Sequence, residues 1–238
     1  MAKTIPKKEL TAKDIYDILI NDEKLIGEKG NILFSLKGIS VTIKSKDVIG
    51  NIIQDWFAGW LDSKGIYYSL PTNTQKFPDF HLSKGNSQIG LLEIKAFDRN
   101  AGPNFDIANF ESYCRSLKSN AYRLDADYLI FGYQMDSSFD IEISDIWLKK
   151  IWEISGSSEA YPVKIQQKQA IIYNLRPSNW YSNGKLRYPP FKSKVEFVLA
   201  LNDTLNKYPK TKPTSKGWLK VVNENYRLFS KVDLVKTI

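Results

Sequence analysis

A nine-residue apolar segment constrains the fold of this chain more than any other sequence feature. Residues Asp127–Met135 read Asp-Tyr-Leu-Ile-Phe-Gly-Tyr-Gln-Met, with apolar side chains at consecutive positions rather than at alternate ones. A strand that is apolar on both faces needs cover on both sides, which places it in the middle of a sheet. Because helical and strand patterns surround it, the sequence predicts an α/β fold with a mixed central β-sheet flanked by helices.

An amphipathic helix is predicted ahead of that sheet, between Asp47 and Asp62. Its apolar residues recur at i, i+4 and i+8 on one side, and Asp47 stands where a side chain can cap the first turn. Two short apolar runs precede it, Ile32–Leu36 and Ile39–Ile43. The Lys-Gly pair between these runs predicts a hairpin.

The rest of the chain is assigned from the same periodicities. Three candidate strands follow the helix, and turn-forming residues between the second and third predict that these two pair as a hairpin. The strands are Ile66–Leu70, Phe77–Leu82 and Gln88–Phe97. The remaining elements are a helix over Leu10–Ile20, a helix over Phe105–Leu117 with Cys114 as a small buried side chain, a strand over Phe139–Ile143, a helix over Ser144–Ile154, a hairpin over Val163–Leu175, a loop over Arg176–Pro190, and helices over Phe191–Tyr208 and Ser215–Ser230.

Positive charge is concentrated in the last quarter of the chain. Residues 176–238 hold 13 Lys and Arg against 4 Asp and Glu, whereas residues 1–175 hold 21 against 22. A basic segment of this kind favours a polyanion such as double-stranded DNA as a partner, although a solvated basic tail has the same composition. Aromatic residues are spread through the segment, which predicts that it is folded.

The residues with the clearest chemistry lie in the predicted hairpin. Asp79 falls in its first strand, and Glu93 and Lys95 fall in its second. Since side chains alternate along a strand, Glu93 and Lys95 share one face about 7 Å apart, at about 3.3 Å per residue. The hairpin can bring Asp79 opposite Glu93. Two neighbouring carboxylates repel each other without a cation, and Mg²⁺ prefers hard oxygen ligands. A lysine beside that metal can orient a water for phosphodiester hydrolysis.

An Asp followed by an acid-x-Lys triplet is a weak pattern by itself. The chain contains a second instance, Asp47 followed by Asp62-Ser63-Lys64, on a predicted helix where no hairpin brings the groups together. For the first set, the alternative interpretation is an exposed Asp79 beside a structural ion pair between Glu93 and Lys95. The helix before the set, and the helix and strand after it, favour the catalytic interpretation.

These residues resemble the PD-(D/E)XK nuclease superfamily and, within it, the type II restriction endonucleases. Pro78-Asp79 matches the first half of the superfamily motif, and Glu93-Ile94-Lys95 matches the second half. The wider sequence is similar to NgoBV-like restriction enzymes. The similar segments are Lys46–Gln54, Asn73–Gln75, Pro78–Phe80, Ile94–Phe97 and Phe105–Ala108.

The resemblance implies a restriction-endonuclease-like core at about residues 47–135, within a single endonuclease domain of residues 1–238. It implies Mg²⁺ as the cofactor, with Asp79 and Glu93 as its ligands, and a homodimer that makes double-strand breaks at a short specific DNA site. Members often place a Glu or Gln on the helix before the motif, facing the metal. Gln54 is the matching position here, and Asp55 is its rival.

The polar and aromatic loop at residues 176–188 is the best candidate for DNA recognition, within a basic region of about residues 160–238. Arg pairs with guanine and Asn with adenine in the major groove. The alternative is a surface loop that contacts only phosphates, or nothing. The candidate DNA-binding residues are Arg176, Asn179, Trp180, Tyr181, Asn183, Lys185 and Arg187.

Other function classes find little support in the sequence. His81 is the only histidine, which argues against His-pair zinc nucleases and Ser-His-Asp hydrolases but leaves open a role beside Asp79. The chain has no phosphate-binding glycine loop and no long apolar window, so neither a nucleotide cofactor nor a membrane partner is expected. A lone cysteine and the lack of a signal-peptide pattern predict a cytoplasmic location. A repair nickase, a junction resolvase and a non-catalytic DNA-binding module remain alternative functions.

Overall fold

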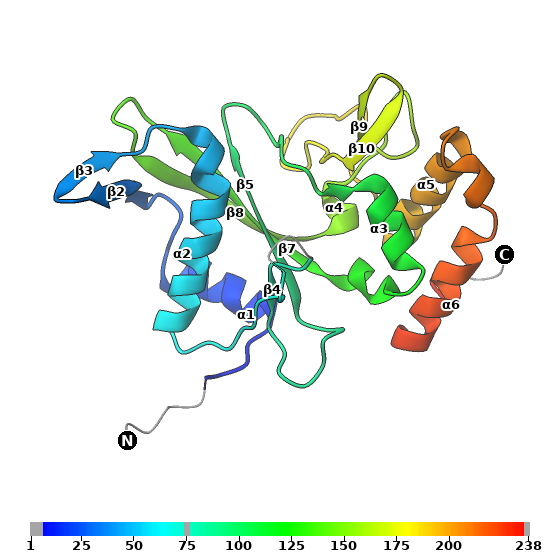
Figure 1. The fold of residues 1–238 in the computed structure, drawn as a ribbon, viewed down its shortest axis with the longest axis horizontal. Coiled ribbons are helices and arrows are strands. Elements are labelled where there is room, and N and C mark those ends of the chain that lie inside the picture. The colour runs from blue at the N-terminus through cyan, green and yellow to red at the C-terminus, as the bar shows by residue number, and fades with distance from the viewer. Residues whose placement is uncertain (1–6, 74–76, 236–238) are drawn as a thin grey trace. The chain divides into compact units, whose positions relative to one another are not determined.

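The computed structural model describes residues 7–73 and 77–235 (Figure 1). It divides into two compact units: the first comprises Met1–Pro103 and Asp127–Leu148, and the second comprises Asn104–Ala126 and Lys149–Ile238. The chain therefore passes between the units three times. Two residues of the NgoBV-like segments, Thr74 and Gln75, lie outside the described residues. The same holds for residues 1–6, on which the signal-peptide prediction was based.

A mixed five-stranded sheet forms the centre of the first unit, in the order β1-β8-β7-β5-β4. β5 runs parallel to β7, with Lys95 beside Ile130, whereas β4 is antiparallel to β5. The mixed sheet and the strand predicted at residues 127–135 are confirmed. The strands are β1 Lys29–Gly30, β4 Phe80–His81, β5 Leu91–Asp98, β7 Asp127–Met135 and β8 Ile141–Lys150, the last two residues of which belong to the second unit.

β7 lies between β5 and β8, and its residues 128–133 are all buried, as its consecutive apolar residues predict. Leu129 and Phe131 join the main core cluster of the first unit. The helices α1 (Ala12–Asp17) and α2 (Ile49–Ser63) supply the other half of that cluster, and a π-helical turn at Ile18–Asp22 continues α1. Each large apolar side chain buried in this way contributes about 1.5–3 kcal/mol.

Helix α2 confirms the predicted helix and its buried side, but not its predicted cap. Ile53 and Phe57, four residues apart, are both buried. A 3-10 turn over Lys46–Val48 precedes the helix, and in it the Ser45 hydroxyl accepts the Asp47 N–H at 3.4 Å. Because Asp47 is itself inside this turn, its side chain does not cap α2, and the prediction of that cap is wrong.

Two predicted strands are shorter than expected. Ile66–Leu70 forms only isolated bridges, among them one between Ser69 and His81 whose two hydrogen bonds are both 2.9 Å. Phe77–Leu82 contracts to the two residues of β4. Pro71 follows the first segment and Pro78 lies within the second. Proline has no N–H to donate to a strand ladder, which limits the pairing.

The region after β7 contains the largest difference from the sequence prediction. A helix is predicted over Ser144–Ile154, but β8 continues to Lys150, and only the turn α4 (Ile151–Ile154) is helical. β8 pairs with β7 along the sheet, and Ile146 packs into the main core cluster. Sheet pairing and burial outweigh the local helical pattern here.

A separate hairpin in the first unit confirms the one predicted around the Lys-Gly pair. It consists of β2 (Leu33–Leu36) and β3 (Ile39–Thr42), which pair antiparallel. Lys37 and Gly38 both have positive φ, at 50° and 82°. Two such residues make the tight turn whose twist matches paired strands, and glycine adopts that conformation without steric cost.

The second unit combines a small sheet with helices. Its strands are β6 Ala108–Asn109, β9 Ile165–Lys168 and β10 Ile171–Leu175, in the order β6-β10-β9. Besides α4, its helices are α3 Phe110–Leu117, α5 Lys194–Lys207 and α6 Trp218–Ser230, with 3-10 turns at Ala121–Asp125 and Lys212–Thr214. The predicted C-terminal helices and the hairpin before them are confirmed. In the described parts of both units, no helix combines the length and the apolarity that crossing a bilayer requires.

Helix α3 begins at Phe110, five residues after the predicted start at Phe105. The Ile107 N–H donates to a carbonyl of β10 at 3.0 Å, and β6 continues this pairing, so the chain is extended up to Asn109. Asn109 then caps the helix by accepting the Ser112 N–H at 3.0 Å. Cys114 is buried on α3 as predicted, and burial raises the pKa of its thiol.

Phe57 tests the core that supports α2. Its ring is fully buried and packs edge-on against Phe80, with 5.2 Å between centroids, and it stacks on Trp60. We expect Phe57→Ala to lower the free energy of unfolding by about 3–5 kcal/mol. Leu228→Ala, at a position of α6 that is 70% exposed, is the control and should change it by less than about 0.5 kcal/mol. Urea unfolding measures both, and equal losses would contradict this assignment of the core.

Candidate active site

The hairpin of β4 and β5 sets the position of Asp79. Phe80 pairs with Leu92, so the antiparallel register brings Asp79 opposite Glu93. Strand pairing stops there because the preceding residue is a proline. The Ile94 N–H donates instead to Oδ2 of Asp79 at 2.8 Å, so a carboxylate takes the place of a strand carbonyl at this edge of β5.

Glu93 and Lys95 occupy one face of β5, as the strand period predicts. The Lys95 ammonium lies 2.9 Å from Oε1 of Glu93. The other oxygen of Glu93 accepts the main-chain N–H of Asp79 at 3.3 Å. The side chains of Glu93 and Lys95 are only 10% and 19% exposed, so water screens this pair weakly. The structure therefore brings the three sequence-predicted residues into one hydrogen-bonded chain.

Helix α2 adds a fourth polar group. The side chain of Gln54 hydrogen-bonds to the Asp79 carboxylate. Asp55, its rival in the sequence, is exposed and lines the same cavity of about 310 Å³. Gln54 is therefore the residue of this pair that contacts the cluster. The cavity is lined by Asn51, Gln54, Asp55, Ala58, Leu70, Pro71, Asp79 and Phe80.

Burial, first, and the charge of the neighbouring Glu93, second, raise the pKa of the Asp79 carboxyl from 3.8 to about 6. The Ile94 N–H, the Lys95 ammonium and the Gln54 amide act in the opposite direction. These three stabilising contacts do not outweigh desolvation and repulsion. The site therefore holds negative charge that its own residues do not fully compensate.

The donor set fits a hard divalent cation. Two carboxylates, Asp79 and Glu93, lie side by side with an excess of negative charge, which a cation would offset. In the described residues, no cluster of three or more His, Cys, Asp and Glu side chains is arranged to hold a metal. Mg²⁺ is commonly held by one or two carboxylates, with waters and substrate phosphates as its other ligands. Asp79 and Glu93 are thus the residues that could hold it.

The second Asp and acid-x-Lys pattern is structural. Asp47 precedes α2 and Asp62 lies near its end, which separates them by about 22 Å at 1.5 Å per helical residue. Asp62 pairs with Lys7 at 2.5 Å, and Lys64 pairs with Glu23 at 2.5 Å. Neither Asp62 nor Lys64 belongs to the candidate site, so both positions serve as matched controls for it.

Three of the candidate DNA-binding residues make side-chain contacts within the second unit. Arg176 forms an ion pair with Asp106. The Trp180 ring packs against Phe105 at 6.0 Å and against Tyr181 at 5.6 Å between centroids. Arg176 would have to exchange Asp106 for DNA in order to contact a base, and Trp180 helps to hold the loop in its fold.

The other polar candidates face solvent. Asn179, Asn183, Lys185 and Arg187 are all exposed. Arg187 lies 3.6 Å from Glu159, but both side chains are more than 70% exposed, and such surface pairs contribute little. These four side chains are accessible to a ligand.

Lys164 is a cation near this loop that the sequence analysis missed. Its ammonium donates to the Pro177 carbonyl at 2.8 Å, and its own carbonyl accepts the Arg176 N–H at 3.0 Å. Burial and the Arg176 charge lower the pKa of Lys164. No local motif marks this residue; only the register of the hairpin that contains it would have placed it beside Arg176.

Comparison with known proteins gives a consistent result over nearly the whole chain. The family model of the NgoBV restriction endonuclease matches residues 9–237. The chain is 42% identical over 219 residues to the type II restriction enzyme NlaIV of Neisseria lactamica, which covers 92% of this chain and 90% of that enzyme. It is also 42% identical over 163 residues to the type II restriction enzyme NgoBV of Neisseria gonorrhoeae, which covers 68% of this chain and 92% of that enzyme.

The similarity extends to three dimensions. The solved structure of the NlaIV restriction endonuclease matches this chain with a TM-score of 0.91 at 40% sequence identity. The match covers 95% of this chain and 92% of that one. These values confirm the predicted fold class, a mixed sheet flanked by helices with a restriction-endonuclease-like core, and they confirm the resemblance to NgoBV-like enzymes.

The raised pKa of Asp79 predicts a pH-dependent instability of the metal-free protein. The folded state favours protonated Asp79, so this contribution to stability is present below pH 4 and is lost as the pH rises through about 6. Asp79→Asn removes the charge. In the presence of a chelator, we expect the variant to exceed the wild type in free energy of unfolding by about 3 kcal/mol at pH 8, and by about half of that at pH 5.

Denaturant unfolding at the two pH values, repeated with Mg²⁺, measures this effect. Mg²⁺ should raise the stability of the wild type at pH 8 and have little effect on Asp79→Asn. Asp62→Asn is the control, because Asp62 is exposed and lies outside the cluster. An advantage of Asp79→Asn that does not grow between pH 5 and pH 8 would contradict the assigned charge repulsion.

Proposed function

We propose that Asp79, Glu93 and Lys95 form the active site of this chain, which belongs to the NgoBV restriction endonuclease family. The chain is a type II restriction enzyme, a site-specific deoxyribonuclease whose substrate is double-stranded DNA. One observation carries the proposed site: two carboxylates and an amine converge from paired strands in one hydrogen-bonded chain. Hydrolysis of a phosphodiester needs a metal, a positioned water and stabilisation of a developing anion, and this set can supply all three.

Enzymes of this type use a divalent metal, and we propose that it is Mg²⁺ here, held by Asp79 and Glu93. When bound, Mg²⁺ would lower the pKa of a coordinated water and offset charge on a phosphate oxygen. The weakly exposed setting of Glu93 supports a strong electrostatic effect. The excess negative charge at Asp79 supports binding of a cation at this place.

Lys95 is proposed to orient the attacking water. In the hydrolysis, the water oxygen bonds to phosphorus while one P–O bond of the backbone breaks. The water gives up a proton, and the leaving oxygen gains one from solvent. The Lys95 ammonium has three N–H donors and lies 2.9 Å from Oε1 of Glu93, which places it where it can hold the water and stabilise phosphate charge.

Gln54 is proposed as a positioning residue. Its amide contacts the Asp79 carboxylate from α2, in addition to the contact that Asp79 makes with the Ile94 N–H of β5. Asp79 is thereby held from two elements, which limits its rotation. A change at Gln54 should therefore act on the site through Asp79.

The loop at residues 176–188 is proposed as the DNA-recognition surface, within the basic region of about residues 160–238. Its exposed members, Asn179, Asn183, Lys185 and Arg187, have the donors that base edges and phosphates accept. Arg176 is proposed to join them after releasing Asp106. Trp180 and Tyr181 support the loop through their ring contact. The catalytic core is proposed to lie at about residues 47–135.

A homodimer is proposed as the active assembly. A two-fold symmetric enzyme suits a short symmetric DNA site, since each copy then cuts one strand. Membership of a type II restriction family favours this function over a nickase or a junction resolvase. A non-catalytic binding module is disfavoured by the complete set of Asp79, Glu93 and Lys95.

Lys95→Ala tests the proposed catalytic set. We expect the variant to cut plasmid DNA in Mg²⁺ at least about 10²–10³-fold more slowly than the wild type, because the water and the phosphate charge lose their ammonium. Binding to the same DNA in Ca²⁺ should change little, since the residue acts on the reacting group. Timed digestion and a gel-shift titration measure the two effects.

Lys64→Ala is the matched control for this experiment. It removes a lysine whose partner, Glu23, lies outside the cluster, and should leave the cleavage rate within about twofold of the wild type. Cutting by Lys95→Ala at the rate of the control would disprove the proposed role of Lys95.

Lys185→Ala combined with Arg187→Ala tests the proposed DNA surface. We expect weaker DNA binding and a salt dependence, log Kd against log salt, that is shallower by about 2 if both residues contact phosphates. A smaller change of slope, together with a loss of discrimination between DNA sequences, would indicate that Arg187 contacts a base. Lys13→Ala, an exposed lysine of α1, is the control and should leave the slope unchanged. Binding identical to the wild type would remove this loop from the interface.

A further inference from the structure

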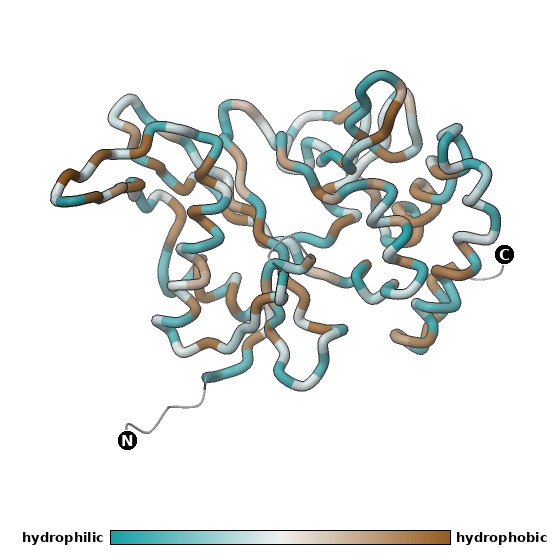
Figure 2. The backbone as a smooth tube through the Cα atoms, viewed as in Figure 1, coloured by the Kyte–Doolittle hydropathy of each residue, from teal (hydrophilic) through white to brown (hydrophobic). Residues whose placement is uncertain are grey.

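The hairpin β2–β3 has one face that is apolar and exposed. Its register places the pairs Phe34–Val41 and Leu36–Ile39 on one side, and the pairs Leu33–Thr42 and Ser35–Ser40 on the other. The two serine hydroxyl oxygens lie 2.7 Å apart. The four apolar side chains are between 49% and 70% exposed. Figure 2 shows these hydrophobic positions along the hairpin, which extends from the first unit.

Such a pattern predicts that the apolar face is buried against something. Alternation of apolar and polar residues along a strand is typical of a sheet with one covered face. A two-stranded hairpin without that cover is marginally stable in water. The four side chains of this face stay about half exposed or more in the folded chain, so the chain alone does not cover them.

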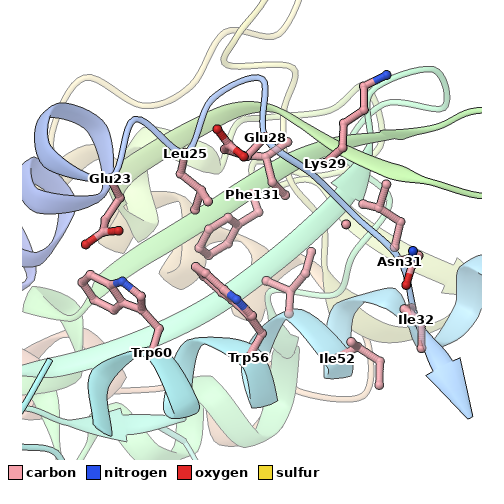
Figure 3. Close-up of a pocket in the computed structure, with 14 residues that line it drawn as sticks. Glu23, Leu25, Glu28, Lys29, Asn31, Ile32, Ile52, Trp56, Trp60 and Phe131 are labelled. Carbon is pink, nitrogen blue, oxygen red and sulfur yellow. The ribbon is translucent and has the colours of Figure 1, made fainter. Parts of the chain in front are cut away.

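An apolar groove lies at the base of the same hairpin (Figure 3). It has a volume of about 380 Å³ and is formed by α2, β7, β8 and the segment before β2. Trp56 and Ile52 of α2 line it and are 42% and 37% exposed. Ile32 lines it too and shares the hairpin face with Phe34, two residues further on. The groove and the apolar hairpin face therefore form one continuous surface.

We propose that this surface is the interface between two copies of the chain, with each hairpin lying over the groove of the other copy. The inference rests on the homodimer proposed above and names its contact surface. A projecting hairpin and a groove on the same molecule are complementary under a two-fold axis, which a symmetric dimer requires. The tight turn at Lys37 and Gly38 joins β2 and β3 directly, so the two strands form one continuous hairpin.

The exposed area supports a second copy as the occupant. With about 200 Å² for a large side chain, the six exposed hairpin and groove residues present roughly 600 Å² of apolar surface. Partly exposed groove residues add to this area. The sum approaches the ~800 Å² that each partner buries in a stable protein interface, and it lies at the upper limit for an isolated apolar patch of a monomer.

The charges around the groove disfavour DNA as the occupant. Glu23, Glu28 and Lys29 line it, and Figure 3 labels all three. Glu23 pairs with Lys64 and Lys29 pairs with Glu142, so the groove has no excess of positive charge for a phosphate backbone. Contacts to DNA are rich in Lys and Arg rather than in the apolar side chains that make up most of this groove. A protein surface with its own apolar face matches this groove better.

The double substitution Leu36→Glu with Ile39→Glu tests the interface. Sedimentation at low micromolar protein without DNA should show the wild type as a dimer and the variant at the monomer mass of 27.4 kDa, with a dimer dissociation constant raised at least 100-fold. Leu228→Glu, at a position of α6 that is 70% exposed, is the control and should remain a dimer. An unchanged unfolding temperature of the double variant would show that the fold is intact.

A second experiment tests the arrangement of hairpin and groove. Ile39→Cys and Trp56→Cys are made as separate variants, since the native Cys114 is buried and will not interfere. Mixing the two under mild oxidation should give more disulfide-linked dimer than either variant alone. A mixture that crosslinks no better than the single variants would overturn the placement of each hairpin over the groove of the other copy.

The outcomes separate this inference from the proposed active site. A monomeric wild type, or a double variant that stays dimeric, overturns the interface whatever the cleavage rate. A double variant that stays dimeric but binds DNA more weakly assigns the hairpin to DNA instead. A chain that dimerises through the hairpin but does not cut DNA refutes the active site alone.

Discussion

The hydrogen bond from the Ile94 N–H to the Asp79 carboxylate is the contact on which the site depends. A buried backbone donor needs an acceptor, and β4 pairs with β5 for only two residues before a proline ends the ladder. A carboxylate fills that gap and is thereby fixed beside Glu93. The same contact satisfies the sheet and concentrates negative charge. The metal-free protein is accordingly less stable above the pKa of Asp79, and a bound cation would restore what is lost.

Features set by local pattern were predictable from the sequence. The central strand, the hairpins and the buried side of α2 follow from periodicity, which reports burial directly. The course of residues 144–150 was not predictable, because Ser144–Lys150 is a strand only by virtue of its neighbour β7. The start of α3 was missed for the same reason, since β6 exists only as a partner of β10. Non-local pairing decided each of these segments.

For the site, the residue types and the convergence of the three motif residues were predictable from the sequence, whereas the contact made by the helix was not. The strand period placed Glu93 and Lys95 together, and the hairpin placed Asp79, as the structure has them. The contact of Gln54 with Asp79 was expected from family resemblance rather than from spacing, because it joins a helix to a residue 25 positions later, just before β4. The partners of Arg176 and the position of Lys164 depend on tertiary contacts that no local pattern encodes.

The interleaving of the two units has a consequence for how such a chain can evolve. Asn104–Ala126 of the second unit is inserted between β5 and β7 of the first, and the rest follows after Leu148. Neither unit is therefore encoded by one uninterrupted stretch of gene. A crossover after Leu148 would exchange the proposed recognition loop but leave behind Phe105 and Asp106, which contact Trp180 and Arg176 of that loop. Exchange of this loop between relatives therefore requires matching changes in the inserted segment.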